Sequence, residues 1–253
     1  MSENGLDLSG QVLHQPDLSD ATLVEPDLRG LRVVGAFVGG LEVWPFAGRF
    51  DGPVLVDGVD VTAFVEAELD RRYPERAAVR QAQDDGTVAQ LTAAWTAVRI
   101  GWAGTLERLE QASPEVREQR VRGEWSAAQT LRHLVAAVDI WIGRMLAETE
   151  APFHPLGLLP EDYPLEGSRA LGLDPLGSAP WPAVRTAFED AGRRVDAALG
   201  DLTDADLGTD RTGLPAPDWG PETRTARQCV AVVLREHVAH RRYLERDLAT
   251  LLG

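Results

Sequence analysis

The sequence contains no lysine, a single cysteine and a single asparagine. All 25 basic residues are arginine, which excludes lysine chemistry such as Schiff-base formation and the phosphate-binding P-loop. The lone Cys229 excludes an internal disulfide framework. No apolar run reaches the length of a bilayer span, and the first ten residues, which are neither basic nor hydrophobic, do not resemble a secretory signal. We therefore expect a cytoplasmic protein that does not enter a membrane.

Acidic residues dominate the charge. The chain has 40 of them against 25 basic ones, a net charge of −15. This balance argues against a nucleic-acid partner, because phosphate contacts need clustered cations. Residues 1–70 hold thirteen acidic residues and three arginines. A solvated acidic exterior is the simpler interpretation of this segment. The alternative is a partner-binding module whose acidic surface mimics DNA.

The first part of the chain carries a five-residue repeat of apolar residues. A period of five fits neither a helix nor a strand, but it suits a solenoid in which each short side contributes one inward residue. The segment resembles the pentapeptide-repeat family, which implies a short right-handed β-helix over residues 1–61. Eight repeat positions make about two coils, which is short for a solenoid that stands alone. These positions are Leu8, Leu13, Leu18, Leu23, Leu28, Val33, Val38 and Val43.

Residues 62–84 are predicted to form a helical connector between two parts of the chain. An amphipathic helix is indicated from Thr62 to about Val79, with Phe64 on its apolar side. Pro74 limits or divides this helix, because proline removes a backbone donor and clashes with the preceding turn.

Residues 85–253 have the apolar period of α-helices, so the fold class is mainly α. Two long segments rich in proline and glycine, 150–180 and 213–221, are read as ordered loops. Four helices with two long connections predict a four-helix bundle that departs from simple up-down order. The expected helices are 87–110, 126–148, one that starts near 181, and 225–252.

A carboxylate and an imidazole share one face of the last helix. Glu236 and His240 are four residues apart and lie within its apolar stripe. An unpaired buried carboxylate costs several kcal/mol, so each group needs a partner inside the bundle. A divalent metal would supply one, with a third ligand from another helix. Outside the last helix, His133 is the one histidine that falls on a predicted helix, so it is the candidate for this third ligand.

Other interpretations remain open from the residues alone. A Glu-x-x-x-His pair also occurs on salt-bridged helix surfaces and in hydrogen-bonded cores. His237 could replace Glu236 as a ligand, although helix phase puts it on the flank. Cys229 lies roughly 10 Å before Glu236 along the helix, too far to share a metal, and is expected in the core. His14 is expected at the surface.

Three motifs carry a family resemblance. They are Gly-Glu-Trp-Ser at 123–126, Thr-Leu-Arg-His-Leu at 130–134, and the histidine-bearing helix 236–247. The region 85–253 resembles the actinobacterial DinB-like family of metal-binding four-helix bundles, and the glutamate form resembles the mycothiol-dependent maleylpyruvate isomerases. The ligands that this resemblance implies are His133, Glu236 and His240.

The resemblance also implies a chemistry. Two histidines and one glutamate leave metal positions open, as catalytic sites do. Zinc is the first choice, with nickel, iron or manganese as alternatives. The implied activity is that of a thiol-dependent S-transferase or isomerase acting on a small-molecule thiol or electrophile, with mycothiol as the thiol cofactor and a homodimer as an expected assembly. His154, Arg242 and Tyr243 are candidates for binding the cofactor or an anionic substrate.

A non-enzymatic function competes with this one. The same three ligands would serve a metal-binding or stress-related scaffold without catalysis. Fold-level analogy does not separate the two functions.

Overall fold

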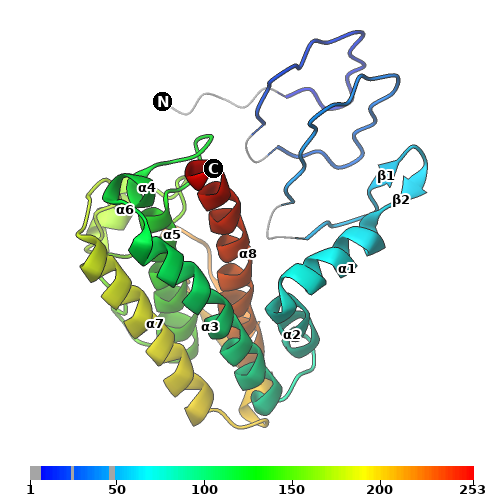
Figure 1. Ribbon diagram of the computed structural model, residues 1–253. Helices are drawn as coiled ribbons and strands as arrows, with labels where there is room; N and C mark the ends of the chain where they lie inside the picture. The colour runs from blue at the N-terminus through cyan, green and yellow to red at the C-terminus, as the bar shows by residue number, and fades with distance from the viewer. Residues whose placement is uncertain (1–6, 24–25, 46–48) are drawn as a thin grey trace. The chain divides into compact units, whose positions relative to one another are not determined.

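The computed structural model describes residues 7–23, 26–45 and 49–253, and it is mainly helical (Figure 1). Residues 1–42 and Val43–Gly253 belong to two separate compact units. No helix in the described ranges is long and apolar enough to cross a membrane. The larger unit contains β1 (Leu55–Val56), β2 (Val59–Asp60), α1 (Thr62–Arg72), α2 (Pro74–Gln83), α3 (Val88–Gln111), α4 (Pro114–Glu118), α5 (Ala127–Val138), the π-helical η2 (Asp139–Leu146), α6 (Leu165–Ala170), α7 (Trp181–Asp201), the 3-10 turn η3 (Asp206–Gly208), β3 (Asp210–Gly213), β4 (Glu222–Thr225) and α8 (Ala226–Leu252).

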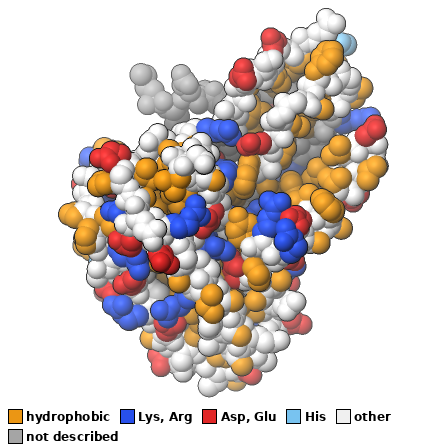
Figure 2. All heavy atoms as spheres, in the orientation of Figure 1, with side chains coloured by type: hydrophobic (Ala, Val, Ile, Leu, Met, Phe, Trp, Pro, Cys, Tyr) orange, Lys and Arg blue, Asp and Glu red, His pale blue; other side chains and the backbone are white. Residues whose placement is uncertain are grey.

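The first unit does not show the expected β-helix. Its described residues, 7–23 and 26–42, form turns but no strand. The repeat does have a local effect: Asp7, Asp17 and Asp27 each accept a hydrogen bond from the backbone N–H two residues ahead, at a spacing of ten. The central apolar side chains are exposed, with Leu18 at 61% and Val38 at 68%, and hydrophobic side chains lie at the surface (Figure 2). Two coils bury too little apolar surface to close a solenoid core.

The region predicted as a connector packs onto the bundle. The expected helix is divided at Tyr73, so that Pro74 becomes the first residue of α2, where its missing N–H costs nothing. Helix α2 lies against α3 and α8, with Val79 and Ala82 in the shared core. Arg76 at its start is buried and pairs with Asp70 of α1 at 2.7 Å, which joins the two short helices.

Helices α3, α5, α7 and α8 form the four-helix bundle. Helix α3 packs against α7 and α8, and α5 also packs against α7 and α8. Helices α3 and α5 are therefore diagonal partners in the cross-section of the bundle, and so are α7 and α8. The long connections make these diagonal steps possible, and the bundle departs from simple up-down order as predicted.

The apolar stripes expected from the 3.6-residue period form the core. In α3, α5, η2 and α7, the apolar residues that repeat at the helical period are buried. Examples are Leu91 and Trp102 of α3, Leu131 of α5 and Val195 of α7. The helix boundaries of α3 and α8 agree with the prediction within one residue.

Three local features were not predicted. The second long helix changes from α to π geometry at Asp139, whose carboxylate is fully buried in the bundle. Strands β3 and β4 form an antiparallel hairpin around the expected 213–221 loop. The 150–180 connection contains the short helix α6. None of these carries a periodic apolar signal long enough to read from sequence.

Candidate metal centre

Three side chains from two helices converge beside the bundle core. One ligand atom each from His133, Glu236 and His240 lies within 4.8 Å of the other two. The Glu236 Oε2 atom is 3.5 Å from His133 Nε2 and 3.2 Å from His240 Nε2. These are the three residues that the sequence selects. Their convergence makes this group a candidate metal site in the described part of the chain.

The position of His133 is fixed by the start of α5 and by the long loop. Ser126 caps the helix, and its side chain and that of Gln129 exchange hydrogen bonds with each other's backbone N–H groups. The His133 Nδ1 atom lies 3.2 Å from the Leu158 carbonyl oxygen. Since a carbonyl can only accept, Nδ1 carries the proton and Nε2 presents a lone pair toward Glu236. This tautomer is the one that a metal ligand needs.

Arg132, next to His133, holds the same loop against α5. Its guanidinium donates to the carbonyl oxygens of Leu156 at 2.9 Å, Gly177 at 2.6 Å and Asp174 at 2.5 Å. These three bonds explain why a connection rich in proline and glycine is ordered, as predicted. They also keep the Leu158 carbonyl in place for His133.

The electrostatics of the three groups favour metal ligation. Burial alone raises the pKa of Glu236, but the two imidazoles more than offset it and hold this pKa well below its usual value. Burial lowers the pKa of His133, and His240 lowers it further, while Glu236 acts in the opposite direction. At neutral pH the site therefore presents an ionised carboxylate and a neutral His133 imidazole, the forms in which these groups bind metals.

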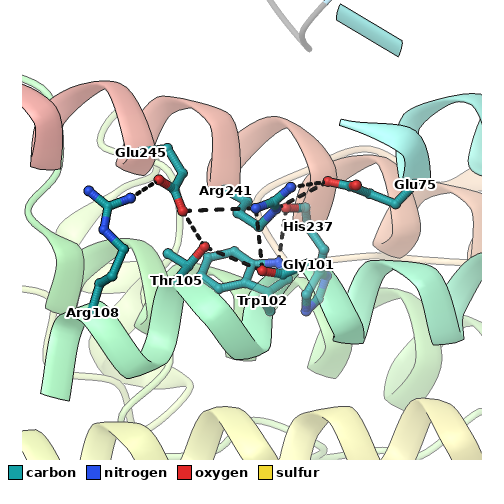
Figure 3. A network of polar contacts seen from close by, with 8 residues as sticks. All are labelled: Glu75, Gly101, Trp102, Thr105, Arg108, His237, Arg241 and Glu245. Atoms are coloured by element: carbon teal, nitrogen blue, oxygen red, sulfur yellow. Dashed lines mark hydrogen bonds and ion pairs between the residues drawn. The ribbon is translucent and has the colours of Figure 1, made fainter. Parts of the chain in front are cut away.

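A polar network locks α8 against its neighbours (Figure 3). The Arg241 guanidinium pairs with the buried Glu75 of α2 and donates to the Gly101 carbonyl of α3 at 3.3 Å. A Cβ atom at position 101 would lie 3.0 Å from that guanidinium, so glycine permits the close approach. Glu245 accepts a hydrogen bond from Thr105 of α3. The network fixes the rotation of α8 and thereby the direction of Glu236 and His240.

His237 lies in the core rather than at the site. It is 1% exposed, and its ring is 5.0 Å from Trp95, 6.4 Å from Trp102 and 5.7 Å from Phe188, between ring centroids. Its Nδ1 donates to the Val233 carbonyl at 2.8 Å, and its Nε2 has no partner in the described structure. Burial lowers the pKa of His237 to about 4.

The selection of Glu236 over His237 agrees with the geometry, but the predicted reason for it was wrong. His237 is more buried than Glu236, whose side chain is 31% exposed, and than His240, at 18%. Helix α8 is covered on several sides, so a single apolar stripe does not describe it. Cys229 is buried, as expected, and burial raises its pKa to about 11.

Trp125 is a site residue that the sequence interpretation did not single out. Its ring is 4.4 Å from His133 and 5.7 Å from His240, between centroids, and nearly parallel to the latter. Its Nε1 donates to Glu161 at 3.1 Å. Its place in the quoted motif, eight residues before His133, is the signal that could have identified it. Trp125 forms one apolar wall of the site.

The three predicted cofactor-binding residues are placed differently from one another. Tyr243 lies beside the site, with its ring 5.9 Å from His240, and it donates to the Pro45 carbonyl at 2.9 Å. Arg242 is 3% exposed and lies over the ring of Tyr73, at the α1–α2 side. The Nδ1 atom of His154 accepts a hydrogen bond from the Leu156 backbone N–H, and the backbone N–H of His154 donates to the Asp139 carboxylate. Of the three, the structure brings Tyr243 to the residues of the candidate metal site.

The donor set fits a divalent transition metal. Two imidazole nitrogens and one carboxylate oxygen suit zinc, nickel, iron or manganese, and three protein ligands leave further positions open. The backbone hydrogen bond of His133 supplies the orientation that ligating histidines usually have.

Comparison with known families gives one result. Residues 97–244 match the family described as the DinB superfamily, and this range contains all three site residues. No curated protein and no solved structure matches the chain.

Proposed function

The chain belongs to the DinB superfamily, and we propose that it binds a divalent metal through His133, Glu236 and His240 and uses it in reactions of a small-molecule thiol. The observation that carries the metal part is the convergence of three ligand atoms within 4.8 Å from two separate helices. When bound, the metal would supply the Lewis acidity that lowers the pKa of a thiol at the open positions.

The chain's own residues supply the rest of the site. Glu236 stays ionised between two imidazoles and balances the charge of a cation. Trp125 and Tyr243 flank His240 and exclude water from two sides. Because the Glu236 side chain is 31% exposed, a small molecule can approach from that side. The thiol class is supported by the likeness of the Glu-x-x-x-His helix to that of the mycothiol-dependent maleylpyruvate isomerases, with zinc as the first metal.

The first experiment measures bound metal. Purified protein is expected to contain about one equivalent of divalent metal, and His133→Ala and His240→Ala are expected to lose it with an unchanged circular dichroism spectrum. His14→Ala is the matched control, because His14 is exposed and belongs to the other unit. Full metal retention in both site variants would refute the ligand set.

The second experiment separates an enzyme from a scaffold. Metal-loaded protein is mixed with mycothiol and a panel of electrophiles, and both the consumption of thiol, which reports conjugation, and the conversion of each electrophile, which also reports isomerisation, are followed. Conjugation or isomerisation that disappears in Glu236→Gln supports the thiol chemistry. Metal binding without any such reaction would instead support a non-catalytic metal-binding scaffold.

A further inference from the structure

A cavity of about 350 Å³ lies beside the first turns of α8. Its walls come from Gln83 and Asp84 at the end of α2, from η3, and from the segment between Arg224 and Arg235. None of its lining residues belongs to the candidate metal centre, so it is a separate site. Its volume is within the range of small-molecule pockets.

Three arginines line this cavity, which we call the arginine pocket. They are Arg224, Arg227 and Arg235, and Asp84 is the one carboxylate of the lining. Such a gathering of cations is unexpected in a chain whose net charge is −15. Like charges held together in a partly buried place repel one another, so the cluster costs stability unless an anion compensates it.

Arg235 has no partner among the residues that the structure describes. Its side chain is half-buried, and in the described ranges no acceptor or carboxylate forms a hydrogen bond or ion pair with it. An uncompensated guanidinium in this position is the kind of group that a bound anion stabilises.

Arg227 is satisfied in part, and Arg224 is paired. The Arg227 Nη1 atom donates to the backbone carbonyl of Asp84 at 2.7 Å, while its buried Nε has no acceptor in the part of the chain that the structure describes. Arg224 pairs with Glu222 at 2.6 Å and lies over the ring of Trp141. Unused donors therefore remain on Arg227 and Arg235.

Helix geometry places these two arginines on one face of the pocket. Arg227, Ala231 and Arg235 are each four residues apart on α8, so the two guanidinium-bearing positions are separated by about 12 Å along the axis. Ala231 between them is small, which leaves room for a ligand. The positive end of the α8 dipole lies at the same place and adds to the attraction for an anion.

We infer that the arginine pocket binds a small organic anion that carries phosphate or carboxylate groups. A guanidinium group pairs equally well with a phosphate or a carboxylate, in each case through two parallel hydrogen bonds. Either group on the ligand would therefore be recognised. The cavity is larger than a single inorganic anion needs, so a molecule with a carbon or diphosphate framework fits it better.

Titration calorimetry of the full chain at low ionic strength tests this inference, with pyrophosphate and citrate as separate probes. We expect at least one probe to bind at one equivalent. Arg235→Gln should weaken that binding about tenfold or more, since a charge-assisted hydrogen bond is lost. Ala231→Met should abolish it by filling the pocket without changing any charge. Preference for pyrophosphate or for citrate identifies the anionic group.

Arg193→Gln is the matched control, because it removes the same charge from an exposed ion pair with Asp190 on α7. It should bind the probe like the wild type. If neither probe binds the wild type, or if Arg235→Gln and Arg193→Gln weaken binding equally, the inference is wrong. Circular dichroism of each variant separates a lost site from a lost fold.

Discussion

The buried His237 gives the protein an acid sensitivity whose size can be calculated. Its imidazole is 1% exposed among aromatic rings, and burial lowers its pKa from 6.5 to about 4. In the unfolded chain the same imidazole titrates near its ordinary value, so the unfolded state takes up the proton first as the pH falls. Stability that is fully present above about pH 6.5 is therefore lost progressively down to about pH 4.

A difference of about 2.5 pKa units, at 1.36 kcal/mol each, corresponds to about 3 kcal/mol lost over this interval. In His237→Leu this loss should disappear, because leucine has a similar volume and no proton to bind. At pH 7 the variant should differ from the wild type by less than about 1.5 kcal/mol. The unpartnered Nε2 of His237 is removed at the same time, which offsets the lost Val233 hydrogen bond.

The assay is urea unfolding of metal-free protein at pH 7, 5.5 and 4, with chelator present to remove the pH dependence of metal binding. The free energy of unfolding of wild type and His237→Leu is compared at each pH. The pH dependence contributed by carboxylates that both proteins share then cancels in the difference. His14→Leu is the control and should follow the wild type, since His14 is exposed. Parallel curves for wild type and His237→Leu would refute the reasoning.

Two further predictions concern the support of the site. Glu75→Gln should lower the free energy of unfolding by about 3 kcal/mol, because it removes the closer of the two carboxylates that pair with the largely buried guanidinium of Arg241 and leaves only Glu245 at 3.8 Å. Glu189→Gln, in an exposed pair, should cost less than about 1 kcal/mol, and urea unfolding of both variants checks the contrast. Ser126→Ala should cost about 1 kcal/mol by removing the cap of α5, measurable as a lower melting temperature, while equal stability to wild type would contradict the capping argument.

The helices were predictable because their signal is local and long. Leu91 to Leu106 in α3 and Leu131 to Met145 in the second long helix repeat at the helical period, and these positions form the core. The predicted start at residue 126 agrees with the structure, in which Ser126 is the N-cap of α5 and forms a capping box with Gln129. The 150–180 connection is ordered by Arg132, an interaction between distant residues that no local pattern reveals.

The site was predictable in its three candidate ligands and not in its surroundings. The spacing of Glu236 and His240 puts them one turn apart in any helix, and so their proximity required no tertiary information. The contact of Trp125 with both histidines depends on how the segment 123–126 packs against α5 and α8. The burial of His237 depends on the rotation of α8, which the Arg241 network sets.

The five-residue repeat predicted local turns correctly and the overall architecture wrongly. The echo of Asp7, Asp17 and Asp27 was visible in the sequence, and each carboxylate does accept a backbone hydrogen bond at the same point of its turn. A β-helix also needs stacked coils that bury their central residues, and Leu18 and Val38 are exposed. A local repeat therefore does not establish the architecture.

Anomalous diffraction at the metal edge, on crystals of the metal-loaded protein, tests the central claim most directly. We predict one peak at about 2.0–2.2 Å from His133 Nε2, His240 Nε2 and a carboxylate oxygen of Glu236. A peak bound elsewhere in the chain, or one that includes His237 in place of Glu236, would contradict the proposed metal centre.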